Sequence, residues 1–304
     1  MKIDLFQSIH DDWKRLIQQY GINRTENIID NLYKKYAIND VYKNQIYSLI
    51  HYEYRKEIRH QTKIDLEFIV KEWMNSDTKL IDLADKHRVS ASILLRHLLN
   101  KITKNKDETK KWLKNPNYCH NPRLAMDIML INLHDVMEGT ISNQISLNSG
   151  LMFESEIAQV LRQEKISFMT EEELRAKNYD VTPDFRLNLP LILFEIEQER
   201  PINDSVQRNE RKSLCLSRCQ DFQKKHLGQW NESNDKLPMM ITWIECKAFF
   251  ASTECHKEYY QNQYYSYINR FGDGLVLYKY GFVDEIPKNF LQNIHIAEKL
   301  PIFV

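Results

Sequence analysis

The sequence has few glycines, few cysteines and no long apolar run. Its 304 residues include seven glycines and five cysteines. An odd number of irregularly spaced cysteines argues against a disulfide framework and is typical of a reducing compartment. No apolar run approaches the roughly 18 residues that span a bilayer, and acidic residues interrupt the segment MKIDLFQSIHDDWKRL where a secretory signal would be apolar. We therefore expect a soluble intracellular protein without a membrane span.

Neither the metal-ligand spacing nor the overall charge points to a zinc finger or a strongly basic protein. Cys215, Cys219 and His226 fit no common zinc spacing, and a fourth ligand is missing. The 42 Lys and Arg balance the 42 Asp and Glu, which is not typical of a nucleic-acid binder. Residues 1–150 hold 23 of these basic and 19 of these acidic side chains, so they carry +4 and residues 151–304 carry −4. A mildly acidic C-terminal half is what we expect if some of its carboxylates bind a cation.

The N-terminal part is predicted to be an all-α domain. In residues 1–115, apolar side chains recur at three- and four-residue spacing, as in ENIIDNLYKKY and LEFIVKEWM. The two prolines of NPNYCHNP break helix and end this domain. Residues 116–149 are then predicted to form a helical linker. A chain of 304 residues has room for a second domain after it.

The segment Thr78–Ile102 has the pattern of a helix-turn-helix unit. Leu80, Leu83 and Ala84 form one apolar face, and the polar break DKHRVS leads into a second helix. The spacing from the small Ala84 to Val89 and Ser90 lets two helices cross closely, with Ser90 capping the second.

This unit has two readings. In the first, Ser92, Arg96 and His97 of the second helix contact DNA. In the second, the unit is a helical hairpin that packs or binds protein, since Arg88 occupies the turn position where glycine is usual. The lysine-rich run KITKNKDETKKWLK that follows suits either a solvated face or a phosphate contact.

After Gly150 the pattern becomes that of an α/β domain, residues 150–304. FESEIAQVLRQEK is an amphipathic helix, and TEEELRAK opens with a capping box. TPDFRLNL, LILFEIE and MMITWIECKAFF are predicted strands, followed by the long helix ECHKEYYQNQYYSYINRF and the final strand GLVLYKYGFV. The polar stretch at 198–237 is predicted to be a surface insertion between two neighbouring strands.

Two charges in the middle of the apolar strand ITWIECKAFF indicate a site. Glu245 and Lys247 are two residues apart and therefore project from the same face. Burial of such charges costs several kcal/mol unless they pair or hold a metal. Asp184, at the start of an earlier strand, supplies a second carboxylate. Two carboxylates suit Mg²⁺ or Mn²⁺, which keeps waters and binds substrate phosphate.

The alternative is that Glu245 and Lys247 merely pair at a sheet edge and Asp184 caps a turn. The order of the predicted elements favours catalysis, because a helix that carries Glu154 precedes the two strands and a further helix follows them. Lys247 would then steer the attacking water or stabilise developing charge. This arrangement resembles that of PD-(D/E)xK nucleases.

The blocks LRAKNYDVTPDF, WIECKA and SYINRFGDGLVLYKYGF resemble the codanin-interacting nuclease family, known for a Thr-Pro-Asp motif. The likeness covers roughly residues 150–195 and 240–285. It implies helix-turn-helix units followed by a restriction-endonuclease-like domain with a mixed central sheet, similar to archaeal Holliday-junction resolvases.

The resemblance also assigns roles to individual residues. It places Asp184, Glu245 and Lys247 on the catalytic triad and Glu154 on the helix-borne acid, with Asp184, Glu245 and Glu154 as metal ligands. Gln263 and Tyr267 match the resolvase Gln-x-x-x-Tyr, and four-residue spacing puts them on one helix face. Arg270 is expected to contact phosphate, whereas Phe271 and the many tyrosines are expected to pack. Cys246 stands where a small residue such as serine is usual, and the insertion at 198–237 is longer than the family's turn.

Three functions follow from these observations. The first is a Mg²⁺- or Mn²⁺-dependent endonuclease acting on structured DNA. The second is a codanin-binding protein linked to histone-chaperone and chromatin regulation. The third is a helix-turn-helix regulator, which would need no metal. The resemblance further implies codanin as a partner, nuclear and also cytoplasmic residence, and a homodimer like that of the resolvases.

Overall fold

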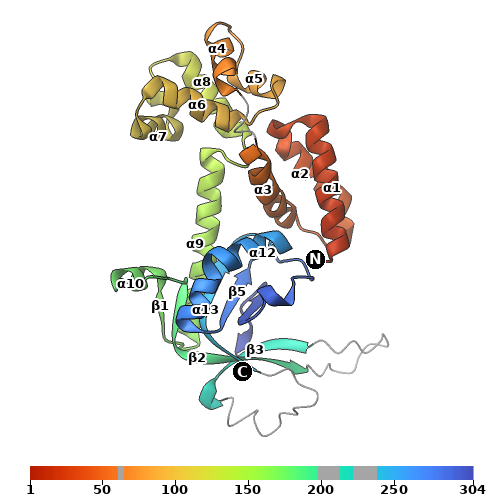
Figure 1. Ribbon diagram of the computed structural model, residues 1–304, viewed down its shortest axis with the longest axis vertical. Helices are drawn as coiled ribbons and strands as arrows, with labels where there is room; N and C mark the ends of the chain where they lie inside the picture. Colours follow the sequence, from red (N-terminus) through yellow and green to blue (C-terminus); the bar gives the residue numbers. More distant parts are fainter. Residues whose placement is uncertain (61–64, 198–211, 222–237, 304) are drawn as a thin grey trace. The chain divides into compact units, whose positions relative to one another are not determined.

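The computed structural model describes residues 1–60, 65–197, 212–221 and 238–303 of the chain (Figure 1). The chain divides into two compact units, Met1–Ser149 and Gly150–Val304. The first is helical and the second is built on a mixed sheet, which confirms the predicted combination of an all-α and an α/β domain. Within the described residues, no helix combines the length and apolar character needed to cross a membrane.

The helical unit consists of α-helices with short 3₁₀ turns between them. The elements are α1 (Ile3–Tyr20), η1 (Ile22–Arg24), α2 (Thr25–Tyr36), η2 (Ala37–Asn39), α3 (Lys43–His60), α4 (Leu66–Met74), α5 (Leu80–Lys86), α6 (Ala91–Thr103), α7 (Lys106–Lys114), η4 (Pro116–Tyr118) and α8 (Pro122–His134). Helix α9 (Thr140–Gln163) begins in this unit and continues past Gly150 into the second.

Helix α8 belongs to the core of the helical unit. Its residues Leu124, Ile128 and Ile131 are buried in one cluster with side chains of α4, α5 and α6. The buried Asp127 of the same helix accepts hydrogen bonds from Trp73 Nε1 at 2.8 Å and from the Leu80 N–H at 3.1 Å. The prediction that residues 116–149 form a linker is therefore wrong for α8, because its apolar face is needed to complete this core.

The predicted turn between α5 and α6 is present. The Val89 N–H donates to the Ala84 carbonyl at 2.9 Å, and the Ser90 hydroxyl accepts from the Ile93 N–H at 3.4 Å as the cap of α6. Arg88 takes a left-handed φ of 54°, the conformation in which glycine is usual. The pattern thus predicted the local geometry of the helix pair.

The expected DNA contact of this pair does not agree with its packing. Ser92 is only 4% exposed and its hydroxyl donates to Asp135, so the prediction that Ser92 reaches DNA is wrong. Arg96 is partly exposed, and its guanidinium donates to the Glu138 carbonyl at 2.8 Å. The segment after α8 covers this face of α6, as in the hairpin reading.

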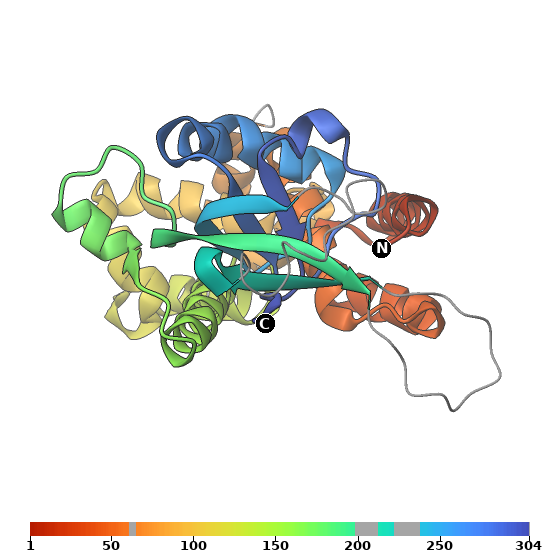
Figure 2. The ribbon, with the colours of Figure 1, turned by 90° about the horizontal axis from the view of Figure 1, so that it is seen from below.

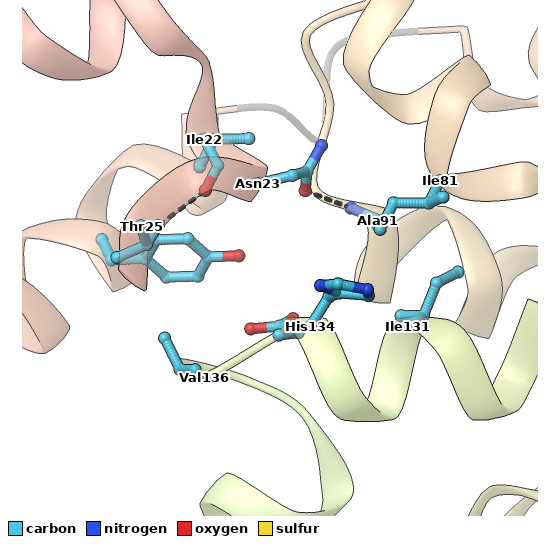
Figure 3. A pocket seen from close by; sticks show the side chains of 10 residues that line it. Ile22, Asn23, Thr25, Ile81, Ala91, Ile131, His134 and Val136 are labelled. Atoms are coloured by element: carbon cyan, nitrogen blue, oxygen red, sulfur yellow. Dashed lines mark hydrogen bonds between the residues drawn. The ribbon is translucent and has the colours of Figure 1, made fainter. Parts of the chain in front are cut away.

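A small pocket of the helical unit lies where η1, α6 and the end of α8 meet (Figure 3). Several of its polar groups already have partners. Asn23 Oδ1 accepts from the Ala91 N–H at 2.9 Å, and the Tyr54 hydroxyl lies 3.2 Å from the Ser90 hydroxyl. None of the predicted catalytic residues lines this pocket.

The second unit is a mixed sheet with helices on both faces. Its strands are β1 (Phe168–Thr170), β2 (Phe185–Glu197), β3 (Lys212–Arg218), β4 (Met239–Lys247), β5 (Gly274–Tyr278), β6 (Ile294–Ala297) and β7 (Ile302–Phe303). In the described part of the chain the strand order is β6-β5-β4-β2-β3-β7, with β1 also paired to β2. Strand β2 runs antiparallel to β1, β3 and β4, whereas β4, β5 and β6 are mutually parallel.

The helices of this unit are α10 (Glu171–Ala176), α12 (Thr253–Tyr259), the π-turn η6 (Tyr260–Tyr264), α13 (Tyr265–Phe271) and the 3₁₀ turn η7 (Lys288–Phe290). Helices α12 and α13 cover one face of the sheet, and α9 from Gly150 onward covers the other (Figure 2). The predicted single helix Glu254–Phe271 thus contains a π-turn. It ends at Gly272, whose φ of 92° suits glycine.

Three strand predictions need correction. The two strands predicted in residues 182–197 form the single strand β2, which shifts register against β4 between Arg186 and Leu191. The strand at β5 is followed by β6 and β7, so it is not the last. Within the predicted insertion at 198–237, residues 212–218 form β3, which pairs with β2. The rest of that insertion, apart from 219–221, lies outside the described residues.

Candidate active site

Asp184 and Glu245 face each other across the pair of β2 and β4. The antiparallel register joins Phe185 to Ile244 and so brings Asp184 opposite Glu245. The Cys246 N–H donates to Asp184 Oδ2 at 2.7 Å, and the Asp184 N–H donates to Glu245 Oε2 at 3.2 Å. Glu245 is 2% exposed. Each carboxylate is therefore oriented by the backbone of the neighbouring strand.

Lys247 lies beside Glu245, as strand alternation predicts. Its Nζ donates to Glu245 Oε1 at 2.7 Å and to Gln263 Oε1 at 3.0 Å, and it lies 4.8 Å from the centroid of the Tyr259 ring. Burial by itself lowers the pKa of this ammonium, but the charge and hydrogen bond of Glu245 outweigh it, so the pKa lies above its ordinary value. Lys247 is therefore a charged group at neutral pH.

The π-turn brings Gln263 and Tyr267 into the same network. Gln263 Nε2 donates to Glu245 Oε1 at 2.8 Å and to the Tyr267 hydroxyl at 2.7 Å. The Tyr267 hydroxyl donates to the Thr182 carbonyl at 3.3 Å, within the Thr182-Pro183-Asp184 motif. The two residues expected on one helix face thus connect Glu245 to the segment that carries Asp184. π-turns inside helices frequently occur at functional sites.

Glu154 of α9 adds a third carboxylate near this cluster. Burial first, and then the charges of Glu171 and Glu245, raise the pKa of Glu154 above its ordinary value. The second cause shows that Glu171 and Glu245 add negative charge near Glu154. The structure therefore brings Glu154 into the electrostatic neighbourhood of the pair on β2 and β4.

Glu171 is a further carboxylate that the sequence reasoning missed. Its N–H donates to the Asp184 carbonyl at 3.2 Å, and its Oε1 accepts from the Thr182 hydroxyl at 3.4 Å and from Arg175 at 2.5 Å. The pairing of Thr170 with Phe185 in β1 and β2 places Glu171 next to Asp184. The capping box at Thr170 was recognised, but only the strand register relates the acid after it to the site.

The remaining predicted site residues are less central. Arg270 is 55% exposed, and its Nε lies 3.4 Å from Asp180 Oδ1. Cys246 packs into the core on the α9 face of the sheet. Of the rejected zinc ligands, Cys215 is buried, Cys219 is exposed and His226 lies outside the described residues.

The carboxylates have the chemistry of a divalent-cation site. Of the three acids Asp184, Glu245 and Glu154, only Glu245 forms an ion pair with Lys247 in the described residues. Burial followed by the charge of Glu245 raises the pKa of Asp184 well above its ordinary range. In residues 1–60, 65–197, 212–221 and 238–303, no group of three or more His, Cys, Asp or Glu side chains is arranged to hold a metal. A cation such as Mg²⁺ requires only one or two carboxylates, because waters and substrate complete its shell. The Asp184–Glu245 pair therefore fits such an ion.

The chain is thus a two-unit protein, in which a helical unit precedes an α/β unit that holds a buried carboxylate–lysine cluster. A family described as "Protein of unknown function TPD sequence-motif" matches residues 120–197 and 233–300. The CDAN1-interacting nuclease 1 of Xenopus laevis is 27% identical over 272 residues, which cover 84% of this chain and 76% of that protein. The Homo sapiens protein of the same name is also 27% identical, over 84% of this chain and 82% of its own length.

The chain is thus similar both to the TPD sequence-motif family and to nucleases that are named for an interaction with CDAN1. The matched residues include the Thr182-Pro183-Asp184 motif. Because these relatives are named nucleases, the comparison supports an enzyme of the nuclease kind. No solved structure matches the chain.

Proposed function

We propose that this protein is a Mg²⁺- or Mn²⁺-dependent endonuclease of the PD-(D/E)xK type, with DNA as its substrate. One observation carries the proposal: Asp184 and Glu245 are opposed on neighbouring strands, with the Lys247 ammonium 2.7 Å from Glu245 Oε1. Two oriented carboxylates and a lysine are the groups that metal-assisted phosphodiester hydrolysis needs. The names of the relatives support the reaction class.

Each residue then has a defined task. Asp184 and Glu245 would hold the cation, which supplies Lewis-acid stabilisation of the phosphate and acidifies water when bound. Lys247 acts as a fixed positive charge, because its raised pKa keeps it protonated. An ammonium has three N–H donors, so Lys247 can donate to a phosphate oxygen while it keeps its bonds to Glu245 and Gln263.

Three other residues orient this group. Gln263 holds Glu245 Oε1 and Lys247 Nζ at the same time, which fixes their spacing. Tyr267 connects Gln263 to the Thr182 carbonyl and so steadies the segment before Asp184. Glu154, whose pKa is raised by burial and then by the charges of Glu171 and Glu245, would orient a water.

A partner-binding role is the second candidate. The relatives are named for an interaction with CDAN1. We propose codanin as a partner of this chain and the nucleus as the compartment of both functions. This role is compatible with catalysis. It would be independent of the carboxylates, so Asp184→Asn would leave it intact.

The test of the nuclease proposal is cleavage of end-labelled four-way, flapped, single-stranded and duplex DNA in Mg²⁺, Mn²⁺ or EDTA. Wild type would be compared with Asp184→Asn and Lys247→Ala, and with Glu172→Gln, an exposed acid of α10, as a matched control. We expect metal-dependent cleavage by wild type and the control, and none by the other two. Folded wild type that cleaves nothing in either metal would refute the proposal.

A further inference from the structure

An arginine and two aromatic rings lie beside the carboxylate–lysine cluster. Asp184 immediately precedes β2 and Arg186 is the second residue of that strand, so strand alternation puts both side chains on the same side of the sheet. The Arg186 guanidinium carbon lies 5.7 Å from the centroid of the Phe271 ring. The Tyr179 ring lies 6.2 Å from the same centroid, with the two ring planes 35° apart. We call Tyr179, Arg186 and Phe271 the stacking cluster.

Two elements lead from the proposed catalytic groups to this cluster over a similar distance. Phe271 follows Tyr267 by four residues in α13, so it lies about 6 Å further along the same helix face. Along β2, Arg186 is about 6.6 Å beyond Asp184. One nucleotide bridges a distance of this order. A strand whose phosphate lies at Asp184 therefore brings its adjoining base to the stacking cluster.

The backbone next to Phe271 is held firmly. The Thr242 hydroxyl donates to the Phe271 carbonyl at 2.7 Å, and Trp243 Nε1 donates to the Gly272 carbonyl at 2.8 Å. Tyr179, Arg186 and Phe271 are nevertheless only partly buried. A platform of rings that are fixed in position and open on one side can bind a flat ligand without first being ordered.

The surrounding charges favour a phosphate-bearing ligand. Arg270 and Asp180 are 55% and 70% exposed, and exposed ion pairs of this kind contribute little to stability. Arg270 can therefore exchange Asp180 for a phosphate at small cost. Within the described residues, no carboxylate lies at ion-pair distance from Arg186. Two guanidinium groups thus flank the rings.

We infer that the stacking cluster binds one unpaired nucleobase next to the scissile phosphate, with Arg270 on the neighbouring phosphate. The inference rests on the proposed nuclease function and specifies its substrate as a strand that is unpaired at the cut. Aromatic and guanidinium planes stack on bases of single strands, loops and ends, whose faces are exposed. In a continuous duplex those faces are covered by the neighbouring base pairs.

Binding without catalysis tests this inference. The full chain in EDTA would be titrated with fluorescein-labelled single-stranded DNA and RNA of one sequence and with the matched DNA duplex. A series of strands would carry a single abasic nucleotide at each position in turn. Wild type would be compared with Phe271→Leu and Tyr179→Leu, which keep apolar bulk but remove the π-face. Tyr265→Leu is the matched control, because Tyr265 of α13 is exposed and its ring lies against Tyr260.

We expect wild type and the Tyr265 variant to prefer single strands and to lose roughly ten-fold in affinity at one abasic position. In Phe271→Leu and Tyr179→Leu that position-specific loss should disappear. The inference is overturned if the affinity of all four proteins is the same at every abasic position, or if no strand binds. The test of catalysis is separate. If the protein shows the expected loss of affinity at one abasic position but cleaves nothing in Mg²⁺, the base site is supported and the nuclease proposal is refuted.

Discussion

Asp184 and Glu245 are bound to each other's strands by reciprocal hydrogen bonds. The Asp184 N–H donates to Glu245 Oε2 at 3.2 Å, while the N–H that follows Glu245, that of Cys246, donates to Asp184 Oδ2 at 2.7 Å. Neither carboxylate can turn away without breaking a buried backbone bond. In the proposed function this fixed pair would hold the cation. Burial and then the charge of Glu245 raise the pKa of Asp184 well above its ordinary range.

The first prediction concerns the effect of metal on stability. In EDTA, Asp184→Asn should be more stable than wild type by about 1–2 kcal/mol, because Asn keeps an acceptor for the Cys246 N–H and removes one of two buried like charges. Adding Mn²⁺ at a hundred times its dissociation constant should stabilise wild type by about 2.7 kcal/mol and leave the variant unchanged. Thermal unfolding with and without Mn²⁺ measures both effects.

Glu172→Gln is the control for that comparison, since Glu172 is an exposed acid next to Glu171, which lies beside Asp184. It should respond to Mn²⁺ as wild type does. If Mn²⁺ stabilised Asp184→Asn as much as wild type, Asp184 would not be a ligand.

The second prediction assigns Tyr267 a positioning role. Tyr267→Phe removes the hydroxyl between Gln263 and the Thr182 carbonyl. Loss of these hydrogen bonds should cost about 1 kcal/mol of stability. The segment before Asp184 should then be less well positioned, so kcat should fall about ten-fold with little change in KM. Tyr265→Phe, on the exposed side of α13, should leave both constants unchanged. A rise in KM at constant kcat would indicate a substrate contact instead.

The proximity of Glu245 and Lys247 could be predicted because it depends only on strand alternation within one segment. Asp184 was found because Pro183-Asp184 begins the adjoining strand. Glu171 could not be found in this way, because its contact with the Asp184 backbone depends on the register of β1 against β2. Register is determined by tertiary pairing and is not visible in a local pattern.

Two other errors have similar physical causes. The helix-turn-helix pattern correctly predicted the Ser90 cap, but it could not show that a segment some forty residues later covers Ser92. Strand β3 was hidden in a polar stretch, although Leu214 and Leu216 alternate with small residues there. Pairing with β2 buries Cys215 and Leu216 completely. Tertiary contact overrode local polarity in both cases.

The third prediction separates the packing role of Ser92 from a DNA contact. Ser92→Ala leaves the Asp135 carboxylate without one of its donors and should destabilise the helical unit by about 1–3 kcal/mol. Affinity for nucleic acid should not change. Urea unfolding and binding titrations measure the two quantities, with Asn100→Ala on the exposed face of α6 as the control. A variant of unchanged stability and weaker DNA binding would restore the recognition-helix reading.

The fourth prediction concerns pH. His256 is fully buried, and its ring nitrogens lie 2.8 Å from the Tyr278 hydroxyl and 2.8 Å from the Phe290 carbonyl. Burial lowers the pKa of His256 below its ordinary value of 6.5. The unfolded chain therefore binds the proton more readily, so this group's stabilisation is complete above pH 6.5 and is lost as pH falls below it.

His256→Gln should accordingly flatten the pH dependence of unfolding between pH 6.5 and 5 by at most about 1.4 kcal/mol per pH unit, the value for one proton. Urea unfolding at a series of pH values, followed by tryptophan fluorescence, measures the slope. His120→Gln, at an exposed position of the helical unit, should leave it unchanged. An equal slope in wild type and His256→Gln would mean that His256 keeps an ordinary pKa in the folded protein, despite its burial between Tyr278 and Phe290.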